Sequence, residues 1–178
     1  MRKALYIFGK LADRDIDWLI SNGAKEELED GAALIRKGSP IGMIYINLTG
    51  SLAVYRDDAE KQKIVLLGVG EFVGEMSFVD SSPASATVKA EGPATVFSIS
   101  RDRLYAHLQE DDGFGSRFYQ AIAIFLADRL RRTVGINEYD EPSDREEEGL
   151  DELNDLVTDT VSMAGERFQR MLNSMLKN

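Results

Sequence analysis

The sequence contains no cysteine and a single histidine, His107. The absence of cysteine excludes disulfide scaffolds, thiol nucleophiles, zinc ribbons and cysteine-ligated clusters, and it is consistent with a reducing compartment. One imidazole cannot supply the several histidines that most catalytic metal centres require. His107 lies between Leu104 and Leu108 in a helical pattern, where a structural role is expected. With no nucleophile–base pair in view, we expect a protein that is not an enzyme and holds no metal or cofactor.

Long apolar runs are also missing. The longest, Ala121–Ala127, is far shorter than the roughly 20 residues of a membrane-spanning helix. The cationic start Met1–Lys3 is followed by an apolar run too short for a secretory signal. We therefore expect a soluble, cytoplasmic protein without membrane insertion.

The net charge of −10 is unevenly distributed along the 178 residues. Residues 137–178 hold 4 basic and 12 acidic side chains, whereas residues 1–136 hold 17 and 19. Such an acidic segment repels phosphate backbones, and it lacks the basic recognition helix of a helix-turn-helix module. We expect no binding to nucleic acid.

Hydrophobic spacing divides residues 1–136 into three parts. Residues 4–22 have helical spacing, which Asn22 and Gly23 end as a C-cap would. Residues 25–100 contain short alternating runs separated by turn residues, which predicts a small antiparallel barrel or jelly roll. Helical spacing then returns. The runs are Ala33–Arg36, Met43–Leu48, Ser51–Tyr55, Ile64–Leu67 and Thr95–Ile99, and the predicted helices are Arg101–Gln109 and Phe114–Val134, the latter with Phe118, Ile122, Phe125, Leu126 and Leu130 on its apolar face.

The remaining residues predict an acidic linker over 137–148 and an amphipathic helix over 149–178. The linker is almost free of apolar groups, and its Ser143 and Glu146 could form a capping box. The helix carries an apolar stripe from Leu150 to Leu176, which must be buried on its own body, on a second copy or on a partner protein. We favour self-association into a homo-oligomer.

The most informative stretch is residues 70–90, Gly-Glu-Phe-Val-Gly-Glu-Met-Ser-Phe-Val-Asp-Ser-Ser-Pro-Ala-Ser-Ala-Thr-Val-Lys-Ala. It resembles the phosphate-binding cassette of the cyclic nucleotide-binding domain family, which includes protein kinase A regulatory subunits and the bacterial catabolite activator protein. Residues 38–54 look like the hairpin of the same family. The resemblance covers about residues 4–134. It implies an α+β fold, an eight-stranded antiparallel β jelly-roll barrel flanked by helices, and it matches Phe114–Val134 to the helix through which bacterial relatives dimerise.

The residues of the cassette suit a nucleotide. Gly74 allows close backbone approach, and Glu75 opens a short helical turn whose N–H groups suit a phosphate. The resemblance implies that Glu75 accepts a ribose 2′-hydroxyl and that Ser85 donates to the phosphate. The full candidate set for binding cyclic AMP or cyclic GMP is Gly74, Glu75, Met76, Ser77, Ala84, Ser85, Ala86 and Thr87.

Ala84 departs from the family pattern, which places a phosphate-binding arginine at this position. Losing a charge-assisted arginine–phosphate pair costs about 1.5–3 kcal/mol, or tenfold or more in affinity. Other cations could replace it: Arg36, Lys37, Arg56 and Lys89 lie on predicted strands. Arg129, Arg131 and Arg132 lie near the C-terminal end of a predicted helix. The first interpretation is interaction with the helix dipole, the second is contact with the acidic linker, and the third is contact with a ligand.

Two functions follow from these observations. The first is a stand-alone sensor of a cyclic nucleotide that signals through helix repositioning and protein contacts, not through DNA. The second is an adaptor or oligomerisation protein of the same fold that has lost nucleotide binding because of Ala84.

Overall fold

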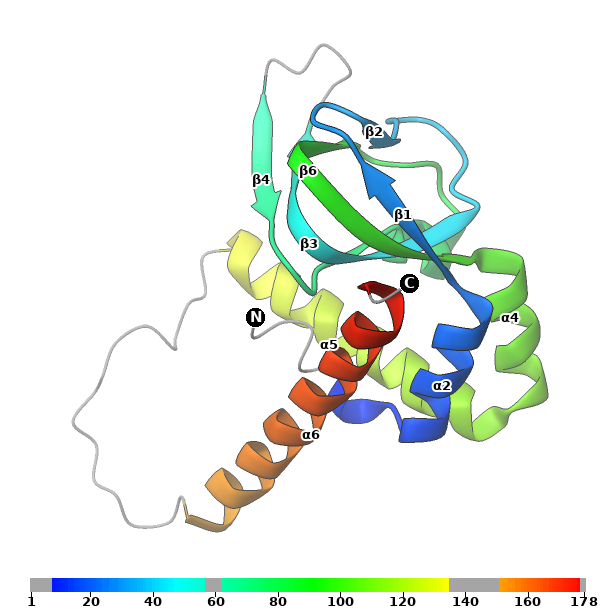
Figure 1. The fold of residues 1–178 in the computed structure, drawn as a ribbon, viewed down its shortest axis with the longest axis vertical. Helices are drawn as coiled ribbons and strands as arrows, with labels where there is room; N and C mark the ends of the chain where they lie inside the picture. Colours follow the sequence, from blue (N-terminus) through cyan, green and yellow to red (C-terminus); the bar gives the residue numbers. More distant parts are fainter. Residues whose placement is uncertain (1–7, 57–61, 135–150, 177–178) are drawn as a thin grey trace.

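The computed structural model describes residues 8–56, 62–134 and 151–176, with the backbone alone described for 132–134 and 151–161. It contains one curved antiparallel sheet flanked by helices (Figure 1). The strand order is β1-β6-β3-β4, with β2 paired to β6 and β5 paired to β3. The strands are β1 (Ala24–Leu28), β2 (Ala33–Ile35), β3 (Met43–Tyr55), β4 (Lys63–Leu67), β5 (Phe72–Val73) and β6 (Thr87–Ser100).

The described part of the chain has six strands where eight were expected. Two sets of turn residues that separate the predicted runs, Thr49 with Gly50 and Gly92 with Pro93, do not end a strand. They lie inside β3 and β6, where the pairing register shifts. Gly50 has a φ of +75°, and a Cβ there would lie 2.4 Å from the carbonyl oxygen of Pro93. The two strands therefore bend past each other at an irregularity of the bulge type and stay continuous.

The helices agree with the sequence prediction except at the N-terminus. α2 (Asp13–Asn22) ends at Gly23 as predicted, but a break at Leu11 and Ala12 separates it from the preceding helical turn. The Asp15 carboxylate accepts from the backbone N–H of Ala12 at 2.6 Å, which fixes the start of α2. The other helices are α3 (Glu75–Asp80), α4 (Arg101–Glu110), α5 (Asp112–Val134) and α6 (Asp151–Leu176).

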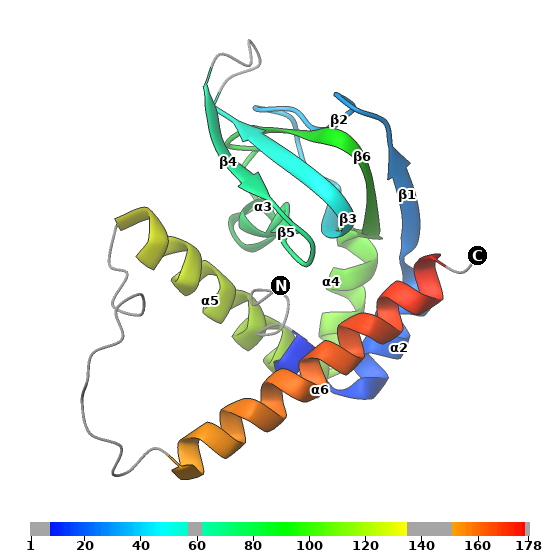
Figure 2. The same ribbon diagram turned by 60° about the vertical axis from the view of Figure 1, so that its left-hand side comes forward.

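Two apolar clusters form the core. One fills the curve of the sheet and includes Leu52, Val73 and Val96. The other joins the sheet to the helices and includes Phe97 from β6 and Phe118 from α5. Figure 2 shows α5 crossing the open side of the curved sheet, with α3 and β5 between them. His107 belongs to the helical layer and stacks on Trp18, with ring centroids 3.9 Å apart.

The C-terminal part of α6 packs on the chain's own body. Its buried side chains, Ala164, Phe168, Met171 and Met175, belong to the same cluster as the helical core. The rings of Phe8 and Phe168 lie 5.3 Å apart. The apolar side chains in this part of α6 are thus buried on the chain's own body, whereas we favoured burial through self-association. The predicted linker over 137–148 lies outside the described residues.

None of the helices in the described ranges combines the length and the apolar character needed to cross a membrane.

Candidate ligand-binding site

A cavity of about 500 Å³ lies between the concave face of the sheet, the cassette and α5. Most of the side chains around it are apolar, as expected for a small-molecule site. The apolar lining is Ile35, Ile41, Val54, Ile64, Val65, Leu67, Val73, Met76, Ala84, Ala86, Val88 and Phe125. Gly74, Ser77, Ser85 and the charged residues Glu71, Glu75, Asp128 and Arg129 complete it.

The turn between β5 and α3 sets the floor of the cavity. Gly74 adopts a φ of +92°, and a Cβ there would lie 2.9 Å from the carbonyl oxygen of Met43. A side chain at this position would be strained both by the backbone angle and by the close approach. The turn places Glu75 at the start of α3 with only 1% of its surface exposed.

Arg129 of α5 covers the Glu75 carboxylate. Its Nη1 donates to Oε1 of Glu75, and its Nη2 lies 3.4 Å from the carbonyl oxygen of Phe72. The guanidinium carbon also lies 4.9 Å from the centre of the Phe125 ring. For the arginines at the end of this helix, we favoured contact with a ligand least, after the helix dipole and the acidic linker. The spacing along the helix could have indicated that Arg129 reaches the cavity. Arg129 follows Phe125 by four residues and therefore lies on the same helix face.

Burial and the neighbouring positive charge change the pKa of the Glu75 carboxyl in opposite directions. Burial raises the pKa of the Glu75 carboxyl above its ordinary value, and this effect exceeds the lowering by the Arg129 guanidinium. The negative charge of Glu71 adds to the increase in pKa. The site therefore holds a carboxylate whose charged form depends on the arginine beside it.

Comparisons with known proteins identify the family of the part of the chain that contains the sheet and the cassette. Residues 25–111 match the family model of the cyclic nucleotide-binding domain. A cyclic nucleotide-binding domain from Methylobacillus flagellatus KT has a TM-score of 0.66 and 26% identity, over 82% of this chain and 85% of that chain. Residues 25–111 belong to the cyclic nucleotide-binding domain family. The predicted family and α+β fold are thereby confirmed.

The relatives of this cyclic nucleotide-binding domain include bacterial regulators. The CRP-like protein Clp of Xanthomonas campestris pv. campestris is 30% identical over 105 residues, or 57% of this chain and 46% of the relative. The chain thus spans about half the length of the curated relatives that it matches. The catabolite activator protein of Thermus thermophilus has the same fold, with a TM-score of 0.62 and 19% identity over 97% of this chain and 87% of that one.

The structure brings seven of the eight candidate ligand residues of this domain to the cavity wall: Gly74, Glu75, Met76, Ser77, Ala84, Ser85 and Ala86. Thr87 is not among the lining residues. It is 1% exposed, and its Oγ1 accepts from the backbone N–H of Lys37 at 3.0 Å. Its side chain therefore joins β6 to the residues that follow β2.

Ala84 forms part of the wall where the family pattern has arginine. Its carbonyl oxygen accepts from the backbone N–H of Gly38 at 2.8 Å, and its own backbone N–H donates to the carbonyl oxygen of Ser39 at 3.0 Å. None of the strand cations considered as replacements, Arg36, Lys37, Arg56 and Lys89, lines the cavity. Lys37 instead directs its Nζ to the carbonyl oxygen of Arg56, at 2.9 Å.

Proposed function

We propose that the chain is a regulatory protein in which the cavity receives a small molecule and α5 carries the response. The observation behind this proposal is the contact of Arg129, on α5, with Glu75, in the cassette. A ligand that reaches Glu75 has to change this contact, and so it has different affinities for two positions of α5. Such a difference is what any ligand-driven switch requires.

Cyclic nucleotides are the first ligands to test. The regulatory domain of a Toxoplasma gondii protein kinase A, 25% identical over 57% of this chain and 39% of that chain, was crystallised with cyclic AMP. The expected result is that a bound ligand changes amide hydrogen exchange around Phe125 and Arg129 in α5 but not in α4. Calorimetry on the same sample measures the affinity. Binding that leaves the exchange of α5 unchanged would contradict the proposed role of this helix.

We further propose that the output passes through protein contacts and not through DNA. Leu130 and Tyr119 of α5 are 63% and 42% exposed, and Leu130 belongs to the apolar face that the sequence predicted for this helix. Exposed apolar side chains on one helix are consistent with a homo-oligomer. Light scattering with Leu130→Glu, compared with the exposed Arg131→Glu, tests this: only the first variant should lower the mass of an oligomer.

Ala84 favours a second candidate function, an adaptor that has lost its ligand. Ala84→Arg restores the cation of the family pattern, and Ala84→Gln is a control of similar length without charge. If the chain is an adaptor, wild-type protein gives no heat with cyclic AMP or cyclic GMP at millimolar concentration, and Ala84→Arg creates binding. Equal affinity of wild type and Ala84→Arg would remove the basis of this candidate.

A further inference from the structure

The guanidinium group at the cavity already has partners within the protein. Among the described lining residues, Arg129 is the one cation, and it contacts the Glu75 carboxylate, the Phe72 carbonyl oxygen and the Phe125 ring. A phosphate that used this guanidinium would have to separate it from Glu75, a carboxylate with 2% side-chain exposure. Separating the pair leaves the buried Glu75 carboxylate either charged without compensation or obliged to take up a proton, and both outcomes cost free energy.

The other charged groups of the wall have the same sign as a phosphate. Glu71 and Asp128 line the cavity together with Glu75. At the position where the family pattern has a cation, the wall instead presents the methyl group of Ala84. An anionic ligand would therefore approach carboxylates without the charge-assisted pair that makes phosphate binding strong.

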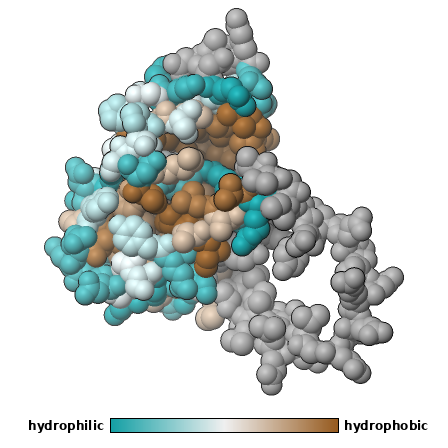
Figure 3. Space-filling model, turned by 180° about the vertical axis from the view of Figure 1, so that it is seen from behind, coloured by the Kyte–Doolittle hydropathy of each residue, from teal (hydrophilic) through white to brown (hydrophobic). Residues whose placement is uncertain are grey.

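The apolar part of the wall is open. Ile64 and Val65 lie on the edge strand β4 and line the cavity, yet they are 51% and 43% exposed. Figure 3 shows apolar side chains gathered on the face of the molecule opposite to that seen in Figure 1. Covering Ile64 and Val65 with an apolar molecule would remove their exposed surface from water, which is favourable in proportion to its area.

We infer that the ligand of this cavity is an uncharged molecule with an apolar body of nucleoside size, and that the cavity disfavours a cyclic phosphate. This inference rests on the proposed function, because it assumes that the cavity is the input site. A volume of about 500 Å³ lies within the usual range for such ligands. The apolar walls hold the body of the ligand. The Glu75 carboxylate accepts a hydrogen bond from a ligand hydroxyl, which changes its contact with Arg129 without leaving either charge uncompensated.

Adenosine and cyclic AMP form a matched pair of probes, because they share base and sugar and differ in the cyclic phosphate. Calorimetric titration of the full chain with each probe, in the same buffer and salt, should show adenosine binding at least tenfold more tightly. The substitution Val65→Lys places a cation on the cavity wall and should shift the preference toward cyclic AMP by threefold or more. Leu66→Lys adds the same charge to the same strand at a 51% exposed residue that does not line the cavity, and it should leave the preference unchanged.

The outcomes separate the ligand class from the proposed function. Tighter binding of cyclic AMP than of adenosine by the wild type would overturn the inference and leave the cavity as the input site. A shift caused equally by Val65→Lys and Leu66→Lys would also overturn it, since a general surface charge would then suffice. No binding of either probe by wild type or variants at millimolar concentration would overturn the proposed function, and the inference with it. Both substitutions fall on exposed side chains, and thermal unfolding checks that each variant is folded.

Discussion

The two ends of α5 use the same kind of ion pair in different ways. Near its start, Arg117 contacts Asp15 of α2 through two hydrogen bonds of 2.6 and 2.8 Å. Near its end, Arg129 contacts Glu75 through one of its nitrogens. Both carboxylates have 2% side-chain exposure. Burial alone therefore does not distinguish the pairs; the number of contacts and the neighbouring cavity do.

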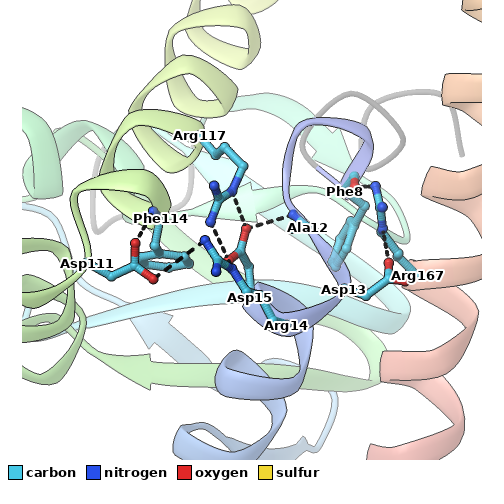
Figure 4. Close-up of polar contacts among 9 residues, drawn as sticks. All are labelled: Phe8, Ala12, Asp13, Arg14, Asp15, Asp111, Phe114, Arg117 and Arg167. Carbon is cyan, nitrogen blue, oxygen red and sulfur yellow. Dashed lines mark hydrogen bonds and ion pairs between the residues drawn. The ribbon is translucent and has the colours of Figure 1, made fainter.

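The Asp15 pair has the features of a fixed anchor. Figure 4 shows Arg117 and the N–H of Ala12 converging on the Asp15 carboxylate, with Arg14 and Asp111 close by. Bidentate geometry and a backbone donor satisfy the carboxylate, which holds α2 against α5. The Glu75 pair borders an open volume, so a ligand can reach one of its partners. The same helix is thus fastened at one end and available to a ligand at the other.

The largest effect is expected from Asp15→Asn. The substitution keeps the size of the side chain but leaves Arg117, 26% exposed, without its counter-charge, and breaking a buried pair on one side costs about 3 kcal/mol of unfolding free energy. Urea unfolding measures this loss. Glu110→Gln, at an exposed carboxylate at the end of α4, is the control and should change stability by less than about 0.5 kcal/mol. Equal losses in the two variants would show that the pair is not an anchor.

A smaller effect is expected from Arg129→Gln in the absence of ligand. The variant leaves the buried Glu75 carboxylate without its charged partner, which costs about 1–3 kcal/mol. The loss is limited because Glu75 can take up a proton, and unfolding at neutral pH measures it. Arg131→Gln, at an exposed residue of the same helix, is the control. The double variant Glu75→Gln/Arg129→Gln should recover part of the loss, and failure to recover any would contradict coupling between the two side chains.

Stability should also depend on pH through Glu75. Burial raises the pKa of its carboxyl above the ordinary value of 4.5, so the folded protein holds this proton at pH values where the unfolded chain has released it. The resulting stabilisation is complete below the unfolded pKa and is lost as the pH rises through the folded pKa. The unfolding free energy of wild type minus that of Glu75→Gln should therefore increase as the pH falls from 7 toward 4.5, by at most about 1.4 kcal/mol per pH unit.

The unfolding free energy of Glu75→Gln has to be subtracted because other groups change the stability in the opposite direction as the pH falls. Hydrogen bonding and nearby arginines hold the pKa values of Asp13 and Asp111 below their usual range, so their contributions are lost as the pH falls. These contributions are common to wild type and Glu75→Gln and cancel in the difference. A difference that stays flat or decreases toward low pH would mean that Arg129 outweighs burial.

The sequence predicted local features of the site better than its long-range contacts. The turn at Gly74 and the short helix from Glu75 follow from neighbouring residues, and both are present. The partners of the two ion pairs are 54 and 102 residues apart, and nothing in the spacing of charges along a chain identifies such pairs. Strand β1, Ala24–Leu28, was missed for a related reason: its Lys25, Glu26 and Glu27 conceal the alternation of a strand.

The amphipathic pattern of α6 shows a similar limit. The spacing of Phe168 and Met171 predicts a buried face but does not say which surface covers it. The structure covers it with α2 and β1 of the same chain. Phe168 also contacts the ring of Phe8, which comes from a part of the sequence far from α6. Position along a face is thus a local property, whereas the choice of partner is a property of the whole fold.

The smallest effect is expected from an exposed arginine pair, Arg170 of α6 with Asp17 of α2. Both side chains are about half exposed, at 50% and 51%, so solvent screens their attraction. Arg170→Gln should lower the unfolding free energy by less than about 1 kcal/mol, and added salt should reduce the difference further. Phe168→Ala, at a 4% exposed residue of the same helix, is the reference and should cost about 3 kcal/mol or more. A loss for Arg170→Gln that approaches the loss for Asp15→Asn would mean that charge, and not apolar contact, holds α6 in place.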